Sequence, residues 1–241
     1  IEMDVVSKVN LKVYPFQLKT QNGNAYEAKA LIVATGASPR RLNVPGEKEF
    51  LGRGVSYCAT CDGFFFRGKE IAVVGGGDSA LQEGLFLTRF ASKVNVIHRR
   101  DQLRAQPILQ ARARENPKMN FMWNSLVKEI RGNGKVQTLV LENTHTHTLS
   151  ELPAQGIFVY IGHTPNTELF KGQLEMNQEG YIKVNERLHT SVPGVFAAGE
   201  AHDHLFRQAI VAAGYGCMAE MEAQKFLVNR EHAQRGAGNR Q

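Results

Sequence analysis

Two cysteines separated by two residues, Cys58 and Cys61 in the stretch CATCD, have the clearest chemical potential in this 241-residue chain. A C-x-x-C pair can hold a metal, staple a loop or shuttle electrons. A structural zinc site needs four ligands, but the chain has no second C-x-x-C, and His145 and His147 lie close together in a polar stretch. A permanent staple gains little from closing so short a loop. The pair is therefore predicted to be redox-active, and no metal site is expected.

Redox exchange needs one cysteine exposed as a thiolate toward a partner disulfide and the other facing an electron donor. Asp62 directly follows Cys61 and could give or take the thiol proton during transfer. The alternative is a turn aspartate before Gly63, which is a common arrangement. We predict catalytic roles for Cys58, Cys61 and Asp62. Cys217 stands alone in a helical pattern and is expected to be a small core residue.

A glycine turn follows the dithiol closely, in the stretch EIAVVGGGDSA. Its G-x-G-x-x-A spacing comes after an apolar strand and before a helix. Such a turn lets the backbone approach a pyrophosphate, and the free N–H groups of the helix N-terminus face the phosphates. A tight turn without a ligand has the same spacing, but the context favours a dinucleotide site. The predicted cofactor-binding residues are Gly75, Gly76, Gly77, Asp78, Ser79 and Ala80.

The end of the next predicted strand selects the nucleotide. An Asp or Glu about 20 residues after the turn would bind the ribose of NAD. This chain has HRRDQLR there instead, and the arginine fork matches the geometry of a 2′-phosphate. Solvated arginines at a helix start are the alternative interpretation. The sequence favours NADPH, with His98, Arg99, Arg100 and Arg104 as further cofactor-binding residues.

The dithiol and the glycine turn flank one predicted strand, residues 70–75. At ~3.3 Å per residue, this strand would hold the two motifs roughly 17–20 Å apart. Nicotinamide and disulfide would then not meet unless the cofactor folded back. A hydride donor and a disulfide also exchange electrons poorly without an intermediary, and a flavin accepts a hydride and reduces sulfur. We therefore expect a flavin in the surrounding part of the chain.

Positioning these motifs requires an α/β unit. Residues 70–98 are typical of strand, glycine turn, helix and strand, which implies a right-handed crossover in a parallel sheet. A second helix is expected over 101–115, and strands over 119–160 with a hairpin turn at Asn133-Gly134. The predicted fold is a Rossmann-like three-layer α/β domain of ββα type.

Residues 37–54, which are rich in Pro, Gly and charge, and a second Gly/Pro interruption at 160–167 indicate linkers on either side of this domain. Strands ending in ATG and AAGE lie outside them, and a final helix is expected over 206–228. The predicted organisation is 1–40 and 162–228 as two flanking segments that hold the flavin, 41–161 as the inserted NADPH-binding domain with the C-x-x-C, and 229–241 as a flexible tail; the family resemblance described below implies that 1–40 and 162–228 are the two halves of a partial FAD-binding domain.

The composition excludes several classes of protein. The net charge of +6 comes partly from three arginines after residue 229, and the rest is scattered, so a nucleic-acid partner is not expected. No stretch approaches the ~18 apolar residues of a membrane span, no N-terminal signal pattern is visible, and three cysteines do not make a secreted disulfide framework. A cytoplasmic protein is expected. The sequence opens at Ile1 in mid-pattern, which we interpret as the interior of a longer protein.

Five motifs together resemble the low-molecular-weight, bacterial-type thioredoxin reductases, a class of pyridine nucleotide-disulfide oxidoreductase: CATCDGFFF, VVGGGDSA, HRRDQLRAQ, IGHTPNT and GVFAAGEAHDHLFRQAIVAAGYGCMA. The resemblance runs in order over about residues 25–227. It implies a homodimeric flavoenzyme with an NADPH domain inserted into an FAD domain, passing electrons from NADPH to FAD, to the cysteine pair and on to thioredoxin. By this resemblance Cys58 attacks the thioredoxin disulfide, Cys61 faces the flavin and Asp62 is the acid.

The chain departs from that family pattern in two places. The opening G-x-G-x-x-G segment that binds the FAD pyrophosphate is not in this sequence, and Gly199-Glu200 stands where the family usually has Gly-Asp. Two alternatives stay open, an inactive fragment that binds NADPH but lacks FAD, and a related flavoprotein reductase with a different disulfide acceptor. The FAD contacts that the resemblance implies are Gly199, Glu200, Arg207, Gln208 and Ala209.

Overall fold

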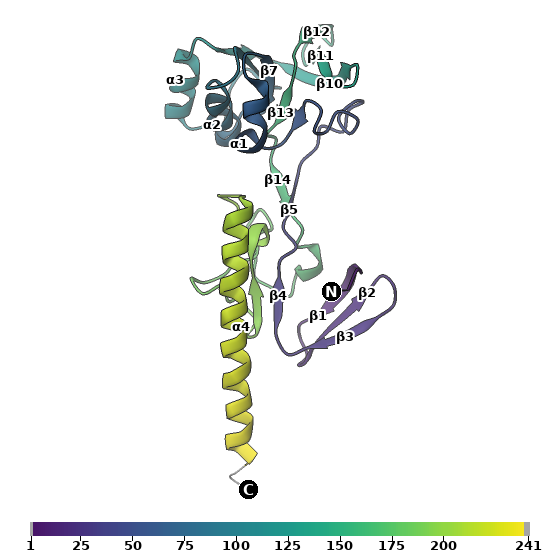
Figure 1. The fold of residues 1–241 in the computed structure, drawn as a ribbon, viewed down its shortest axis with the longest axis vertical. Helices are drawn as coiled ribbons and strands as arrows, with labels where there is room; N and C mark the ends of the chain where they lie inside the picture. The colour runs from purple at the N-terminus through teal and green to yellow at the C-terminus, as the bar shows by residue number, and fades with distance from the viewer. Residues whose placement is uncertain (1, 239–241) are drawn as a thin grey trace. The chain divides into compact units, whose positions relative to one another are not determined.

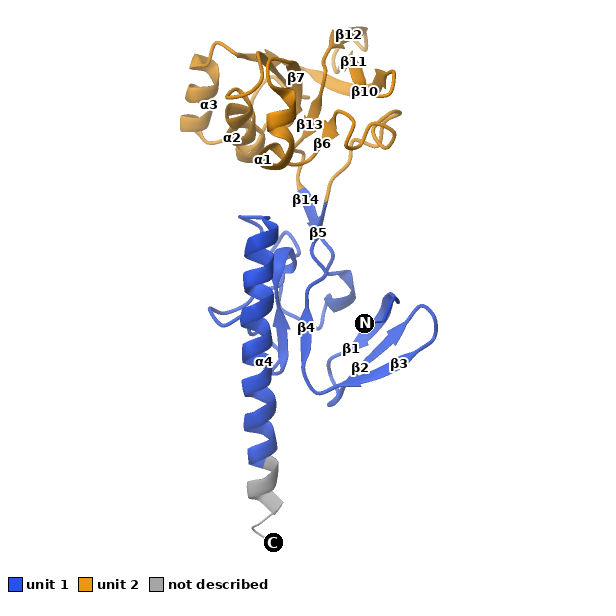
Figure 2. Cartoon of the chain, viewed as in Figure 1, with its two compact units in different colours: residues 1–38, 163–241 blue, residues 39–162 orange. Residues whose placement is uncertain are grey.

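The computed structural model describes residues 2–238, with side chains for residues 2–233, and the chain divides into two compact units (Figures 1 and 2). The inserted unit is Pro39–Gly162. The flanking unit combines Ile1–Ser38 with His163–Gln241. The chain passes between the units along two short strands that pair with each other, β5 (Ala37–Pro39) and β14 (His163–Pro165).

A five-stranded parallel sheet forms the centre of the inserted unit, in the order β6-β13-β7-β8-β9. Its central strands are rich in Val, Ile and Phe and are buried on both faces, as a parallel sheet requires. The strands are β6 (Val55–Ser56), β13 (Ile157–Val159), β7 (Glu70–Val74), β8 (Lys93–Ile97) and β9 (Met119–Met122).

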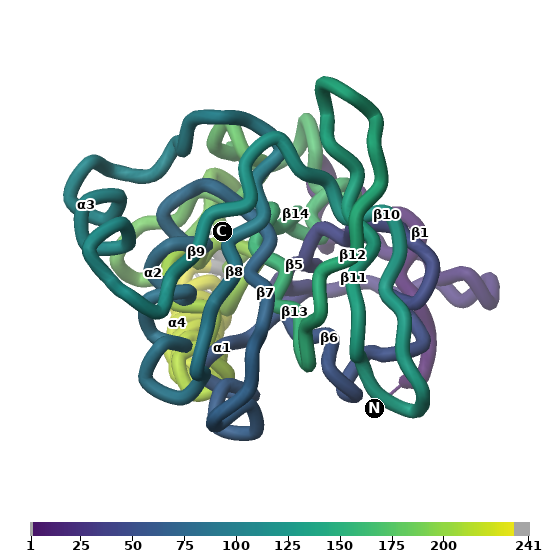
Figure 3. Tube along the Cα trace, turned by 90° about the horizontal axis from the view of Figure 1, so that it is seen from above, coloured from purple at the N-terminus to yellow at the C-terminus, as the bar shows by residue number. Residues whose placement is uncertain are grey.

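Helices cover one face of this sheet and a second, antiparallel sheet covers the other (Figure 3). Alternate residues of β7 show the two sides, because Ile71 packs in a cluster with Leu81 whereas Ala72 packs in a cluster with Leu139. The predicted three-layer ββα architecture is confirmed. The elements are α1 (Ala59–Asp62), the 3-10 turn η1 (Gly63–Phe66), α2 (Asp78–Leu87), α3 (Pro107–Glu115), β10 (Ser125–Gly132), β11 (Val136–Asn143) and β12 (Leu149–Pro153).

Two local predictions for this unit can be compared with the structure. The turn at Asn133-Gly134 is confirmed, since it joins the antiparallel strands β10 and β11. The helix predicted over 101–115 was wrong at its start, because α3 begins only at Pro107. The residues before it are held in a loop by hydrogen bonds to the glycine turn, and proline is well suited to the first turn of a helix.

The flanking unit contains an antiparallel meander, a parallel strand pair and a long helix. The meander places a turn at Asn22-Gly23 between β2 and β3. The pair β4–β15 supplies Val33, Val195 and Ala197 to the core. The elements are β1 (Val6–Asn10), β2 (Phe16–Thr20), β3 (Ala25–Ala28), β4 (Leu31–Val33), β15 (Val195–Ala197), the 3-10 turns η2 (Glu168–Phe170) and η3 (Gly199–Ala201), and α4 (Ala209–Gly238).

Helix α4 differs from its prediction at both ends. It starts at Ala209 rather than near 206, because the buried carboxylate of Asp203 holds the N–H groups of Leu205 and Phe206 in a turn. It continues to Gly238, so the flexible tail expected from 229 is helical over residues 229–238. The good helix formers at 231–235 explain the extension, and residues 239–241 of the expected tail lie outside the described residues.

Candidate redox and nucleotide site

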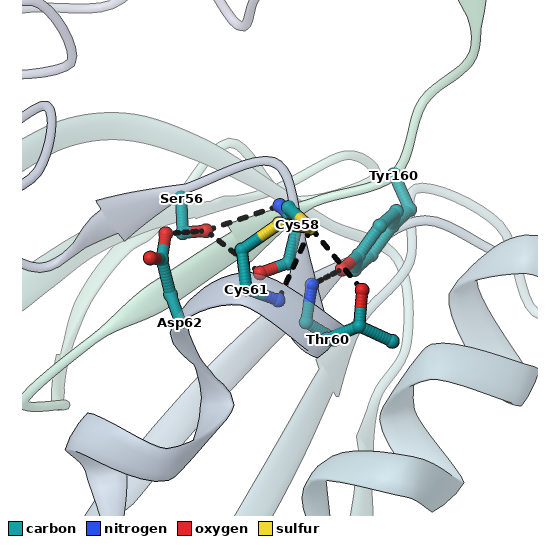
Figure 4. Close-up of a disulfide and its surroundings, with 7 residues drawn as sticks. Ser56, Cys58, Thr60, Cys61, Asp62 and Tyr160 are labelled. Carbon is teal, nitrogen blue, oxygen red and sulfur yellow. Dashed lines mark hydrogen bonds between the residues drawn. A yellow bond between two sulfur atoms is a disulfide. The ribbon is translucent and has the colours of Figure 1, made fainter. Parts of the chain in front are cut away.

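The two cysteines of CATCD form a disulfide at the start of α1 (Figure 4). Cys58 is the N-cap of this single helical turn and Cys61 lies three residues on, which brings their Cα atoms to 5.3 Å, within the range that a disulfide bridges. The backbone N–H of Cys61 donates to Cys58 Sγ at 3.2 Å. Cys61 is exposed and Cys58 half-buried, so this disulfide is accessible from solvent in the inserted unit.

The carboxylate of Asp62 is oriented by a buried serine. The Ser56 hydroxyl donates to Asp62 Oδ2 at 2.6 Å, and the same hydroxyl oxygen accepts the backbone N–H of Cys58 at 3.1 Å. Ser56 is fixed by its place in β6, where it pairs with Phe158 of β13. Figure 4 shows the serine between the acid and the disulfide. Ser56 thus links the carboxylate of Asp62 to the backbone of Cys58, and a carboxylate near a thiol can take part in proton transfer.

The phenol of Tyr160 holds the other side of the disulfide turn. Its hydroxyl oxygen accepts the backbone N–H of Ala59, the first residue of α1, at 2.6 Å. Burial, with a smaller contribution from Glu83, raises the pKa of Tyr160 above its ordinary value, so the phenol stays protonated. Tyr160 directly follows β13, and its N–H donates to the carbonyl of Val74 at 2.8 Å. One residue therefore touches both the redox turn and the strand that leads into the glycine turn.

The glycine turn after β7 is tightly enclosed at two positions and open at the third. Gly75 has φ +149°, and a Cβ there would lie 2.8 Å from the Cβ of Ala80. A Cβ on Gly76 would collide with the imidazole of His98, whereas a Cβ on Gly77 would meet nothing within 4 Å. The turn is closely packed against its neighbours at Gly75 and Gly76 and can be approached from solvent at Gly77, as a phosphate-binding turn requires.

The arginine loop, residues 98–106, closes over this turn. The N–H of Arg104 donates to the carbonyl of Gly76 at 2.7 Å, and the N–H of Gln106 donates to Asp78 Oδ1 at 2.7 Å. Asp78 therefore orients the loop through its carboxylate. His98 is buried, its Nε2 lies 2.9 Å from the carbonyl of Gln102, and burial lowers the pKa of its imidazole. A neutral ring that donates from Nε2 fits this contact, since a carbonyl only accepts.

A hollow of about 420 Å³ lies between the glycine turn, the arginine loop and β10. Of the predicted residues, Gly75, Gly76, His98, Arg99 and Arg104 line it, whereas Arg100, Gly77, Asp78, Ser79 and Ala80 are not part of its lining. Sequence reasoning missed several lining residues, although the basic pair Arg40-Arg41 in the first linker was a visible signal. The missed residues are Arg40, Arg41, Leu42, Val74, Ile97, Ser125, Leu126, Val127, Tyr160 and Ile161.

The expected separation of roughly 17–20 Å between dithiol and glycine turn was wrong. Ser56 ends β6, which runs parallel to β7 in the same sheet with only β13 between them. Cys58 therefore lies at the same edge of the sheet as Gly75, and the chain runs back to the opposite edge through α1 and η1 before β7 begins. Two strand spacings give a lateral separation of about 10 Å. The predicted strand length does not separate the motifs.

The candidate flavin residues of the flanking unit gather where β15 ends and α4 begins. Gly199 takes φ +65°, and a Cβ there would press on Ala212 of α4 at 3.3 Å. Glu200 lies in η3 directly after it, and Arg207 has φ +50° in the loop that precedes α4. Arg207 Nε is buried without a hydrogen-bond partner among the described residues. An orphaned donor beside a long helix N-terminus suits an anionic or carbonyl-bearing cofactor. Gln208 and Ala209 adjoin it and are exposed.

Other predictions concern residues outside these sites. Cys217 is exposed on α4, so its prediction as a core residue was wrong. His147 pairs with Glu142 rather than with His145, and among the side chains that the structure describes no three His, Cys, Asp or Glu gather as a metal site would require. Over residues 2–238, no helix has both the length and the apolarity to cross a membrane.

Comparisons with known proteins give a consistent result. A family described as pyridine nucleotide-disulphide oxidoreductase matches residues 3–216. Thioredoxin reductase of Streptomyces coelicolor is 52% identical over 206 residues, covering 85% of this chain and 64% of that protein. Thioredoxin reductase of Rickettsia felis is 50% identical over 228 residues, covering 93% and 74%. The crystal structure of thioredoxin reductase from Streptococcus pyogenes superimposes with a TM-score of 0.87 at 44% identity, covering 94% and 74%. This chain thus spans about two thirds to three quarters of these relatives' length.

Proposed function

The chain belongs to the pyridine nucleotide-disulphide oxidoreductase family and, within it, to the bacterial-type thioredoxin reductases, and from this premise we propose that the protein is an NADPH-dependent flavoprotein that reduces thioredoxin. One observation carries the proposal. The Cys58–Cys61 disulfide lies at the same edge of the sheet as the glycine turn, and Ser56 orients the carboxylate of the neighbouring Asp62. A disulfide held on the unit that binds the nucleotide is suited to receive that nucleotide's electrons through a flavin.

The inserted unit is proposed to bind NADPH in the 420 Å³ hollow. Its pyrophosphate would lie over the open backbone at Gly77 and the N-terminus of α2. Arg99 and Arg104 line the hollow and would bind the 2′-phosphate, with Arg100 next to them on the same loop. The loop carries no acidic side chain in the hollow that would bind a free ribose hydroxyl, so the charge favours NADPH over NADH.

The flanking unit is proposed to hold FAD through Gly199, Glu200, Arg207, Gln208 and Ala209. The unpartnered Arg207 Nε supports this assignment, and Glu200 offers a carboxylate one methylene longer than the family's usual Asp. When bound, the flavin supplies two-electron transfer between a nicotinamide and a disulfide.

The dithiol's own chemistry follows from thiol–disulfide exchange. The Cys58 thiolate attacks one sulfur of the thioredoxin disulfide, that S–S bond breaks, and a mixed disulfide forms while the partner's other sulfur leaves. Cys61 then attacks Cys58 Sγ, which restores the Cys58–Cys61 bond and releases dithiol thioredoxin. Asp62, held beside the pair, gives or takes the thiol proton. Each catalytic cycle moves two electrons to thioredoxin.

The assembly and location of the protein are part of the same proposal. We expect a homodimer in the cytoplasm, on the model of the family that the motifs resemble. Light scattering of the purified protein tests the dimer, because a homodimer of this chain would have twice its mass of 26.8 kDa.

The assignment of the two cysteines can be tested by trapping. A thioredoxin with a single active-site cysteine, activated as its mixed disulfide with thionitrobenzoate, is added to the reduced Cys61→Ser and Cys58→Ser variants, each carrying Cys217→Ser. The proposal expects fast capture by Cys58 in the first variant and slow capture in the second, mapped by mass spectrometry. Equal capture rates, or faster capture by Cys61, would overturn the assigned roles. Absence of capture in both would count against thioredoxin as the acceptor.

A further inference from the structure

Tyr160 connects two places that the proposed function uses in separate steps. Tyr160 lines the nucleotide hollow together with Gly75 and Gly76, and its hydroxyl oxygen accepts the N–H of Ala59 in the first turn of α1 at 2.6 Å. The backbone of Tyr160 is fixed to Val74 by a hydrogen bond of 2.8 Å. Tyr160 thus lies in the wall of the hollow, while its side chain packs on the helix side of the sheet and reaches the redox turn, and Figure 4 shows its hydroxyl next to that turn.

The redox state of the cysteines changes the constraints on this turn. In the disulfide form, the first turn of α1 is held by the covalent S–S bond, by the Cys61 N–H bond to Cys58 Sγ, and by the Ala59 bond to Tyr160. Reduction breaks the S–S bond and leaves only hydrogen bonds, so the turn has more conformational freedom. The phenol bonded to that turn loses part of its restraint at the same time.

A binding wall that is already ordered costs less to complete when a ligand arrives. We propose that Tyr160 is a positioning residue that couples nucleotide binding to the state of the Cys58–Cys61 pair, so that the hollow binds NADP(H) more tightly when the pair is a disulfide than when it is a dithiol. This inference rests on the proposed function of the hollow. By linkage, bound nucleotide must then favour the disulfide by the same factor. NADP⁺ would leave more readily once the dithiol has formed.

The test measures one affinity in two redox states. The probe is the 3-aminopyridine analogue of NADP⁺, which accepts no hydride, titrated calorimetrically into the 241-residue chain in its disulfide form and after reduction with a phosphine. Coupling between sites typically amounts to about 5-fold or more, so the disulfide form should bind the analogue at least about 5-fold more tightly. In Tyr160→Phe, which lacks only the hydroxyl that accepts the Ala59 N–H, the ratio of the two affinities should fall close to one.

Tyr57→Phe is the matched control. Tyr57 adjoins Cys58, but its hydroxyl donates to Glu47 Oε1 at 2.7 Å and the residue is not part of the hollow's lining. Its affinity ratio should equal that of the unmodified chain. The equilibrium of the cysteine pair with a dithiothreitol redox buffer gives a second readout, since saturating analogue should shift it toward the disulfide by the same factor, and not in Tyr160→Phe.

The outcomes separate this inference from the function on which it rests. Equal binding to both forms of the unmodified chain, tighter binding to the dithiol form, or an unchanged ratio in Tyr160→Phe would overturn the coupling while leaving NADPH binding intact. No binding to either form of the unmodified chain would overturn the proposed nucleotide site, and the coupling with it.

Discussion

Replacing Arg99 and Arg104 by alanine gives a quantitative test of the nucleotide site. Both residues line the hollow next to the glycine turn, and both are exposed. Hydrogen bonds to a charged group contribute about 1.5–3 kcal/mol when solvent is excluded, and exposed ion pairs contribute only about 0.2–1 kcal/mol. An exposed arginine facing a phosphate that carries close to two charges lies between these limits. We take about 1 kcal/mol for each, which is about 5-fold in Kd.

The assay compares two nucleotides that differ only in the 2′-phosphate. Each single replacement should weaken NADP⁺ binding about 5-fold, and the double replacement about 25-fold if the two contributions add. NAD⁺ binding should change little, so the preference for NADP⁺ should fall by the same factors. Because the interaction is electrostatic and exposed, raising the salt to about 1 M, where the Debye length is about 3 Å, should shrink the difference.

Two controls define the result that would refute this reasoning. Arg112→Ala removes an exposed positive charge from α3 and should leave both affinities unchanged. Arg100→Ala should weaken NADP⁺ binding less than Arg99→Ala or Arg104→Ala does, because Arg100 does not line the hollow. Equal losses for NADP⁺ and NAD⁺, or no loss for NADP⁺ in the double variant, would show that these arginines do not read the 2′-phosphate.

Three further perturbations probe the redox turn, the glycine turn and the flanking unit. In Ser56→Ala the carboxylate of Asp62 loses its 2.6 Å hydrogen bond. Oxidation of the reduced chain by a small aromatic disulfide should therefore slow about 10-fold, which corresponds to about 1.4 kcal/mol. An unchanged oxidation rate between pH 5 and 8 would contradict the proposed role of Ser56 in orienting Asp62. Gly76→Ala has no space for its methyl group and should lower the free energy of unfolding by about 1–3 kcal/mol, whereas Gly77→Ala should keep its melting temperature and lose nucleotide affinity; the reverse pattern would refute the packing account. The pKa of Glu222 is lowered to about 2 by Lys225, then by His189 and Arg187. A carboxyl with a depressed folded pKa contributes stability above its unfolded value of about 4.5, and this contribution is lost as the pH falls toward 2. In Glu222→Gln the free energy of unfolding should therefore fall less steeply between pH 4.5 and 2 than in the unmodified chain, and equal slopes in the two proteins would contradict this role.

The chemistry of the site was predictable because local spacing determines it. CATCD and the glycine turn each act over a few adjacent residues, so residue type and order specify what they can do. The collision that excludes a side chain at Gly76 involves His98, which was also among the predicted residues. The parallel sheet followed from the order of strand, glycine turn, helix and strand over residues 70–98, and β7 and β8 are buried on both faces, as such a sheet requires.

Features that depend on tertiary closure were missed. The two-residue strand Val55–Ser56 has no periodicity that a sequence pattern could detect, yet it brings Cys58 to the edge of the sheet where Gly75 lies. Tyr160 and Arg41 enter the hollow only because distant segments meet there. The start of α3 at Pro107 likewise follows from contacts between its preceding loop and the glycine turn rather than from helix propensity.

An anaerobic titration of the purified, flavin-bound protein with NADPH tests the central claim most directly. The visible spectrum is followed while samples are alkylated and the modified cysteines are mapped by mass spectrometry. The account predicts that NADPH bleaches the flavin bands and that Cys58 and Cys61 become alkylated together, two electrons for each NADPH consumed, with Cys217 labelled equally before and after. Bleaching without new thiols at Cys58 and Cys61 would contradict the claim that this disulfide receives the electrons of NADPH.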